Sequence, residues 1–181
     1  MIAKAKNIVL GITGSIAAYK ACDLITALSK KGYNVICITT PEAEEFITPL
    51  TLETLSGNKA YRDMFCLPEK REAAHISLAQ KADLIVLCPA TANIIAKLAS
   101  GICDDLLTTT VISSRAPILI APAMNDNMYK HKLTQKNIRT LQEAGYKFVD
   151  PIRGHLACGY VGVGHLAGIQ EIIKRIDKIL K

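Results

Sequence analysis

Several common features are missing from this chain, and each absence narrows the class of protein. Its 181 residues contain no apolar run near the roughly 20 residues that a membrane-spanning helix needs. The start of the chain enters a strand-like run too early and too briefly for a signal peptide. We therefore expect a cytoplasmic protein that does not span a membrane, folded as one domain over residues 1–181 with a sizeable core.

Paired cysteines and runs of charge are missing as well. The six cysteines form no Cys-x-x-Cys pair, and Cys37 and Cys88 lie in apolar runs where a free thiol behaves as a small hydrophobe. Disulfides and a bound metal are therefore not expected. The net charge is +6, but the basic residues are scattered, with no run beyond two in succession. This pattern is typical of a solvated basic surface and not of a nucleic-acid-binding protein.

What the chain does have is an alternation of β-rich apolar runs with amphipathic stretches of helical length. Continuous apolar runs indicate strands that are buried on both faces. Such alternation predicts an α/β fold in three layers around a doubly wound, Rossmann-type parallel sheet. The five expected strands are Asn7–Ile12, Tyr33–Thr39, Asp83–Cys88, Pro117–Ala121 and Tyr146–Asp150.

Ligands of such sheets bind beyond the carboxyl ends of the strands, so the loops that follow the strands are the places to look for a site. These loops begin at Gly11, Thr39, Pro89 and Pro122. Two longer segments are expected to be irregular: residues 56–74, a connection ahead of His75, and residues 151–168, a glycine-containing loop.

The first of these loops, Gly11-Ile-Thr-Gly14-Ser15, leads into a helix whose unpaired N–H groups and Ser15 hydroxyl suit a phosphate. Its spacing matches neither a dinucleotide fingerprint nor a P-loop. The second strand ends in Thr39-Thr40, without the acidic residue that a dinucleotide ribose requires, so a mononucleotide is favoured. The alternative for Gly14 and Ser15 is a plain turn with a helix N-cap.

The third loop reads Pro89-Ala-Thr-Ala-Asn93, and its small side chains would let a flat ring approach the backbone. Thr91 and Asn93 could bond the polar edge of that ring, although Thr91 is also an adequate N-cap. Further on, Asp104 and Asp105 start a helix, where carboxylates are favourable, and we interpret them as structural.

Three further residue types carry potential chemistry. Asn125 follows an apolar strand and could bind an anionic group or cap a helix, and Cys158 is a lone thiol in a glycine-rich loop. His75 precedes a short helical pattern, where its imidazole would suit proton transfer, an anion contact or a plain cap. The remaining histidines, 131, 155 and 165, have no metal-ligand spacing and are expected to be ordinary residues.

Together these motifs resemble one family over nearly the whole chain. The glycine turn with Ser15, His75, the Pro89–Asn93 stretch, Pro122-Ala-Met-Asn125-x-x-Met128 and Ala157-Cys158-Gly159 occur in the order of the homo-oligomeric flavin-containing cysteine decarboxylases. The resemblance is greatest to those members that decarboxylate 4′-phosphopantothenoylcysteine in coenzyme A biosynthesis. It implies a flavodoxin-like fold, FMN as cofactor, and a homotrimer or trimer-based dodecamer with sites between subunits.

The reaction implied by the resemblance is redox-neutral. The substrate thiol is oxidised to a thioaldehyde, carbon dioxide leaves, and the enethiolate is reduced to 4′-phosphopantetheine. By match of position, His75 and Cys158 would be catalytic, with Cys158 donating a proton, while Asn125 would hold the substrate carboxylate beside Met124, Ala157 and Gly159. The residues expected to bind FMN are Gly14, Ser15, Ile16, Thr39, Pro89, Ala90, Thr91, Ala92, Asn93 and Ala123.

The chain departs from the family pattern at three positions. Trp is common at the position of Tyr129, an acidic residue at that of Tyr160, and Arg at that of His165.

Many relatives continue into a synthetase domain, so a separate phosphopantothenate–cysteine ligase is the expected partner of a chain that ends at Lys181. Three alternatives from the same group of proteins remain: a peptidyl-cysteine decarboxylase of lantibiotic maturation, a flavin prenyltransferase, and a non-catalytic flavin-binding regulatory subunit.

Overall fold

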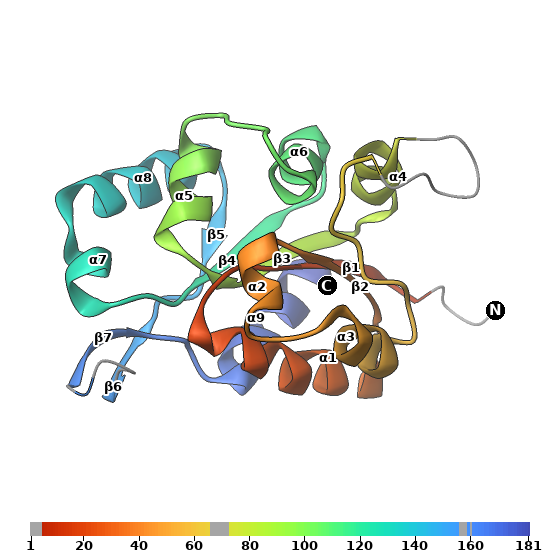
Figure 1. Ribbon diagram of the computed structural model, residues 1–181, viewed down its shortest axis with the longest axis horizontal. Helices are drawn as coiled ribbons and strands as arrows, with labels where there is room; N and C mark the ends of the chain where they lie inside the picture. The colour runs from red at the N-terminus through yellow and green to blue at the C-terminus, as the bar shows by residue number, and fades with distance from the viewer. Residues whose placement is uncertain (1–4, 66–72, 156–158, 160) are drawn as a thin grey trace.

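The chain folds around a parallel sheet in the strand order β2-β1-β3-β4-β5, as Figure 1 shows for a computed structural model that describes residues 5–65, 73–155, 159 and 161–181. This strand order is that of flavodoxin-like folds and confirms the expected doubly wound α/β architecture. The strands are β1 (Asn7–Ile12), β2 (Asn34–Thr39), β3 (Leu84–Ala90), β4 (Ile118–Pro122) and β5 (Lys147–Phe148).

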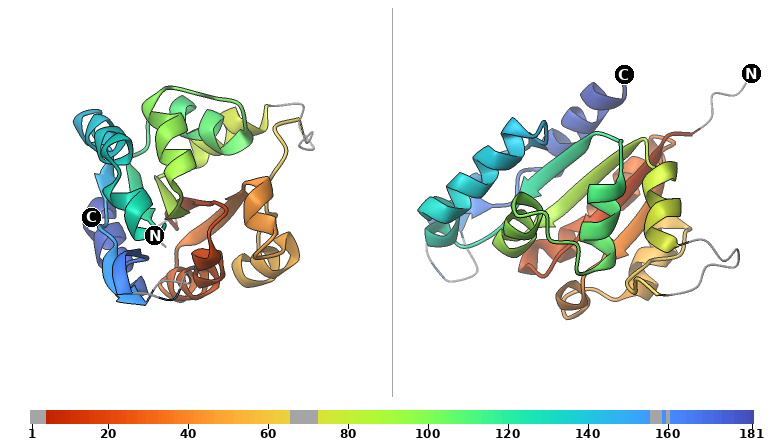
Figure 2. Two further views of the ribbon diagram at one scale, coloured as in Figure 1. Left: turned by 60° about the vertical axis from the view of Figure 1, so that its left-hand side comes forward. Right: turned by 90° about the horizontal axis from the view of Figure 1, so that it is seen from above.

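Helices cover both faces of the sheet and give the three layers (Figures 1 and 2). In the described part of the chain, none of them is long and apolar enough to cross a bilayer. One face carries α1 (Lys20–Lys30), α3 (Pro49–Ser56) and α9 (Ile169–Leu180), and the other carries α4 (Ala74–Lys81), α5 (Ala92–Ala99), α6 (Leu106–Ser113) and α8 (Lys132–Glu143).

The core consists of two apolar clusters, one on each face of the sheet. Ile8 and Leu10 of β1 point toward α1 and α9, while Val9 between them points to the opposite cluster. All seven residues of β3 are buried. Alternate side chains of a strand point to opposite faces, so a strand with helices on both sides must be apolar throughout. This is why the sequence shows continuous apolar runs at these strands.

Three short helices lie in the loops at the carboxyl edge of the sheet. They are η1 (Ile16–Tyr19), which runs directly into α1, α2 (Pro41–Glu44) after β2, and α7 (Asp126–Lys130) after β4. Each begins within a few residues of the end of its strand. Their N-terminal ends, with unpaired backbone N–H groups, therefore gather where ligands of such sheets bind.

All five expected strands are present, with ends that differ by up to two residues from the sequence pattern. The prediction for residues 151–168 is wrong, because this segment contains an antiparallel hairpin of β6 (Ile152–His155) and β7 (Val161–His165). Its strands are short and contain glycine; β6 is mostly exposed, and only alternate residues of β7 are buried. Without a continuous apolar run they gave no strand signal.

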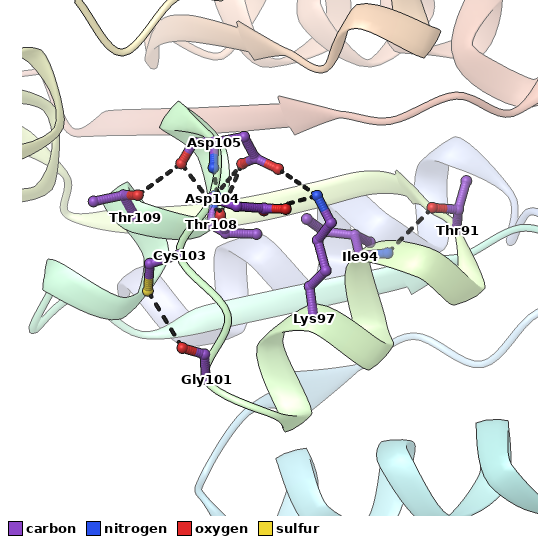
Figure 3. Close-up of polar contacts among 9 residues, drawn as sticks. All are labelled: Thr91, Ile94, Lys97, Gly101, Cys103, Asp104, Asp105, Thr108 and Thr109. Carbon is purple, nitrogen blue, oxygen red and sulfur yellow. Dashed lines mark hydrogen bonds and ion pairs between the residues drawn. The ribbon is translucent and has the colours of Figure 1, made fainter.

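The acidic pair before α6 is structural, as expected (Figure 3). Asp105 is the N-cap of α6 and forms a reciprocal capping box with Thr108. The Lys97 ammonium bonds Asp104 at 2.8 Å and Asp105 at 3.0 Å, which joins α5 to the start of α6. Burial by itself would raise the pKa of Asp105, but bonds from Thr108 and Lys97 outweigh it and lower that pKa. The cap therefore stays ionised at neutral pH.

Candidate active site

The loops after β1 and β3 meet at the point where the sheet order reverses. β1 and β3 are neighbours in the sheet, although β2 lies between them in sequence. The Thr13 hydroxyl donates to the carbonyl oxygen of Pro89 at 2.8 Å and accepts from the Thr91 N–H at 3.0 Å. Such a switch point is the usual ligand crevice of a doubly wound sheet.

Two cavities open beside this turn. The first, of about 440 Å³, lies between the start of η1, the turn after β4, and the hairpin. The second, of about 270 Å³, lies between the ends of β1, β2 and β3. Ser15 lines the first cavity, while Thr13 and Gly14 line the second, so the turn after β1 is a wall of both. Among the residues that the structure describes, no cluster of His, Cys, Asp and Glu could hold a metal ion.

Asn125 lines the first cavity and also caps a helix. It is the N-cap of α7, where its side-chain oxygen accepts a hydrogen bond from the Asn127 N–H at 2.9 Å. The two interpretations of Asn125, as a cap and as a group that faces a ligand, are therefore compatible. Because the cap holds the amide in place, its orientation is set before any ligand binds. Ile16, Ala123 and Met124 line the same cavity.

The hairpin is fastened to the Asn125 turn by hydrogen bonds on either side of that residue. The Met124 N–H donates to the carbonyl oxygen of Gly164 at 3.0 Å, and the Val163 N–H donates to the Asp126 carboxylate at 2.9 Å. A bond from the Lys130 ammonium lowers the pKa of Asp126, so this acceptor stays ionised. The hairpin is thus a fixed wall of the first cavity.

Gly164 is required by this contact. Its φ is 143°, and a Cβ placed there would lie 2.1 Å from the Met124 carbonyl oxygen. An L-residue would be strained in this conformation and would also collide with backbone. The glycine therefore lets two backbone segments approach closely.

Sequence reasoning missed the three basic residues among the described lining of the first cavity: Lys20, His155 and His165. The two histidines were expected to lie outside any site. That expectation is wrong, because the hairpin places both of them in the wall of the first cavity. His131 does behave as an ordinary residue, since its ring nitrogen caps α8. Of the three, only Lys20 could have been found from the sequence, because it lies in the first turns of the helix that follows Gly14 and Ser15.

Thr40 lines the second cavity, whereas Thr39, which was expected to bind the cofactor, does not. The Thr39 hydroxyl donates to Glu44 at 2.9 Å, and Thr39 lines neither cavity. The Thr40 hydroxyl lines the second cavity and is buried, with no hydrogen-bond partner among the described residues. Successive residues at a strand end face opposite ways, so the two threonines have different surroundings. A buried hydroxyl without a partner suits a bound polar group.

The remaining residues expected at a cofactor fall into two groups. Gly14, Thr91 and Asn93 line the second cavity, and Thr91 also caps α5 by accepting from the Ile94 N–H. Pro89 and Ala90 act through their carbonyl oxygens, which accept bonds from Thr13 and from the Ala123 N–H at 3.0 Å. Ala92 is the first residue of α5. Pro89 and Ala90 therefore hold the loops together, while Gly14, Thr91 and Asn93 line the second cavity between those loops.

His75 is not brought to either cavity of its own chain. It lies in the first turn of α4, which packs against α6, far from α7 and the hairpin (Figure 1). Its ring nitrogen Nδ1 is buried and has no hydrogen-bond partner among the described residues. The neighbouring Ile76 is 43% exposed. An apolar side chain is thus exposed beside an imidazole that makes no polar contact through Nδ1.

The lone thiol of the glycine loop, Cys158, and its neighbour Ala157 lie outside the described residues. Gly159 is described, in the left-handed region at φ 90°. Burial raises the pKa values of Cys37 and Cys88 to about 12, so both thiols stay protonated and are poor nucleophiles.

Comparison with known protein sequences gives consistent matches. The family described as Flavoprotein matches residues 2–181. The chain is 47% identical over 173 residues to the coenzyme A biosynthesis bifunctional protein CoaBC of Bacillus subtilis, covering 96% of this chain and 43% of that protein. It is 44% identical over 177 residues to a probable phosphopantothenoylcysteine decarboxylase of Streptococcus mutans, covering 97% and 99%. The chain thus spans less than half of the first relative and nearly all of the second.

Solved structures share the same fold. A PPC decarboxylase mutant complexed with pantothenoylaminoethenethiol superimposes with a TM-score of 0.90 at 28% identity, covering 97% of this chain and 98% of that one. The FMN-dependent cysteine decarboxylase SpaF superimposes with a TM-score of 0.86 at 31% identity, covering 99% and 97%. Each likeness covers nearly the whole of both chains.

The hairpin contact predicts the effect of an alanine at Gly164. Gly164→Ala should lower the free energy of unfolding by about 2 kcal/mol or more, since it adds backbone strain and a collision with Met124. Urea denaturation measures the loss, and amide exchange at Met124 and Val163 should accelerate. The matched control is Gly159→Ala, also at positive φ but with nothing within 4 Å, which should cost about 1 kcal/mol. Equal losses and unchanged exchange would contradict the role of the contact.

Proposed function

The chain belongs to the Flavoprotein family, and on this premise we propose that it is an FMN-dependent phosphopantothenoylcysteine decarboxylase of coenzyme A biosynthesis. It would convert 4′-phosphopantothenoylcysteine to 4′-phosphopantetheine and carbon dioxide. The observation that carries this proposal is the first cavity, where Asn125, Lys20 and two histidines face a space whose described lining contains no carboxylate. Such a lining suits a substrate with anionic groups.

The residues around the turn after β1 fit an FMN cofactor. The Thr40 hydroxyl is buried without a partner among the described residues, and it shares the second cavity with Gly14, Thr91 and Asn93. A Cβ at Gly14 would lie 2.4 Å from the Cβ of Glu42, so only glycine lets α2 close over this turn. We propose that these residues and Ser15 hold FMN, with Ile16, the Pro89–Ala92 segment and Ala123 beside it.

The chain's own residues supply orientation and protons, while bound flavin supplies the reversible two-electron oxidation of the cysteinyl thiol. Asn125 would hold the substrate carboxylate with a neutral amide, beside Met124 and Gly159. A cation at this place would stabilise the carboxylate against departure as carbon dioxide. A neutral donor holds the group without adding that barrier.

Proton transfer is assigned to residues that match the family motif. Cys158, next to Ala157 in the connection between β6 and β7, would donate the proton that completes the reduced product. The described ends of this connection support the proposal, since His155 borders the first cavity and the hairpin is fixed to the Asn125 turn. A protonated thiol is a weak acid that can give up its proton to the developing product.

His75 would act in the site of a neighbouring subunit. Its helix lies far from the first cavity of its own chain, so it can serve that reaction only if another chain supplies Asn125. The orphaned Nδ1 and the exposed Ile76 and Ile112 on the packed pair α4 and α6 support an interface there. We propose a homotrimer, alone or within a dodecamer, with sites that each combine two chains.

Residues 1–181 would act as one flavoprotein unit, with a phosphopantothenate–cysteine ligase supplying its substrate. The Bacillus subtilis relative is bifunctional, and this chain spans 43% of it. A ligase that forms the substrate, whether on another chain or not, is therefore the proposed partner.

The direct test is a product analysis of purified, flavin-loaded protein. We expect 4′-phosphopantothenoylcysteine to be converted to 4′-phosphopantetheine without an added electron acceptor, because the overall reaction is redox-neutral. Mass spectrometry of the products measures this. Conversion of a peptide with a C-terminal cysteine in place of this substrate, or flavin binding without turnover of either, would contradict the proposal.

Asn125→Asp should abolish carbon dioxide release while leaving the fold intact. Aspartate caps a helix as well as asparagine does, so the bond from Asn127 is kept, whereas its charge repels the substrate carboxylate. We expect a fall in kcat/KM of about 100-fold or more, with unchanged Tm and flavin content. Asn127→Asp, a neighbouring exposed change of the same charge, is the control. Near-normal turnover by the Asn125 variant would refute the assigned role.

The shared-site proposal predicts complementation between two inactive variants. His75→Asn and Asn125→Asp chains should each be inactive alone, but mixed trimers should recover about a third of their sites, because a ring of three chains that contains both variants has one junction where an intact His75 meets an intact Asn125. Co-expression with two different tags and tandem purification isolates the mixed species for assay. Verified mixed oligomers without any activity would show that His75 does not serve a neighbouring site.

A further inference from the structure

Lys20 and His165 form a pair across the first cavity. Lys20 is the first residue of α1 and His165 is the last residue of β7, and both line the cavity that contains Asn125. The Lys20 Nζ lies 3.4 Å from the His165 Nε2, and the other ring nitrogen, Nδ1, lies 3.0 Å from the carbonyl oxygen of Leu166. The imidazole is therefore held between an ammonium group and a backbone carbonyl.

The partners of His165 determine which of its nitrogens carries the proton. A carbonyl oxygen can only accept, so Nδ1 must be the protonated nitrogen that donates to Leu166. An ammonium group can only donate, so Nε2 must be the unprotonated nitrogen that accepts from Lys20. Both contacts are satisfied by the neutral Nδ1–H tautomer. A protonated ring would offer two donors and repel Lys20.

This arrangement positions the ammonium group without neutralising it. Among the described residues, no carboxylate lies within ion-pair distance of Lys20, and none lines the cavity. The ring of His165 lies against Gly154, where a Cβ would be 3.4 Å from the ring carbon Cγ, so β6 supports it from behind. The cation keeps its charge and its remaining N–H donors for an anion in the cavity.

The chemistry of the proposed substrate decides which anion this cation serves. The substrate carries a carboxylate that must depart and a phosphate that stays charged throughout the reaction. A cation on the carboxylate would stabilise the ground state against loss of carbon dioxide, whereas a cation on the phosphate adds binding energy without that penalty. The phosphate is also the more highly charged group.

We propose that Lys20 anchors the phosphate of the substrate and that His165 is its positioning residue, acting as a neutral hydrogen-bond acceptor. This inference rests on the proposed function for the identity of the substrate. An arginine at position 165 would have no acceptor and could not hold Lys20 in this way.

The first test compares the phosphorylated substrate with its dephosphorylated counterpart, pantothenoylcysteine. Lys20→Met should reduce the preference for the phosphorylated substrate by about 10- to 100-fold, mainly through KM, as expected for loss of a charge-assisted hydrogen bond. Lys30→Met, which removes the same charge from the other end of α1, should leave the preference unchanged. An equal loss with both substrates would overturn the assignment to the phosphate.

Variants at His165 test its role as the acceptor. His165→Phe keeps a ring against Gly154 but removes both nitrogens, and should reduce the same preference several-fold. His165→Gln, whose amide oxygen can accept near the position of Nε2, should restore most of it. In a Lys20→Met background, His165→Phe should add no further loss, because it acts through Lys20. Independent, additive losses would overturn the positioning role.

A readout that needs no turnover separates this inference from the proposed function. The chain has four histidines, so nitrogen NMR at mildly alkaline pH can resolve each ring. We expect His165 to be the Nδ1–H tautomer, with a shift at Nε2 when Lys20 is replaced by Met. The opposite tautomer would overturn the pair even in an active enzyme. The expected tautomer with no conversion of either substrate would refute the proposed function alone.

Discussion

The hydroxyl of Thr13 holds together the region on which both cavities depend. Thr13 is 1% exposed. Its hydroxyl joins the end of β1 to the end of β3 by donating to the Pro89 carbonyl oxygen and accepting from the Thr91 N–H. The bond from the Ala123 N–H to Ala90 continues the connection to β4. A buried hydroxyl with both its donor and its acceptor used stabilises one arrangement of the loops and penalises others. The switch point is therefore rigid before a ligand arrives.

The hairpin adds to this rigid edge a wall that the sheet cannot provide. A doubly wound sheet offers only loops at its carboxyl edge, which surround a ligand on a few sides. Here β6 and β7 approach the turn after β4 and bond it on both sides of Asn125. Residues from the sheet edge and from the hairpin thus face one space, and His165 reaches Lys20 across it.

Much of the fold could be predicted from the sequence because buried parallel strands leave a strong local signal. The presence of the five strands and the caps at Thr91 and Asp105 follow from short-range patterns. The hairpin could not be predicted, since its stability comes from contacts with a distant turn. Thr40 and His165 were missed for a related reason. The direction of a side chain at a strand end, or on an unrecognised strand, depends on register and not on composition.

The double role of Asn125 has a consequence for which residues this position can accept. Serine, threonine or aspartate would cap α7 but carry no amide, and glutamine carries an amide on a chain too long for the same cap. The side chain at position 125 must therefore cap α7 and also offer an uncharged amide to the ligand. Few other residues can therefore meet both requirements at this position. A change of substrate would have to come from the opposite wall, through hairpin side chains such as His155 and His165 that cap no helix.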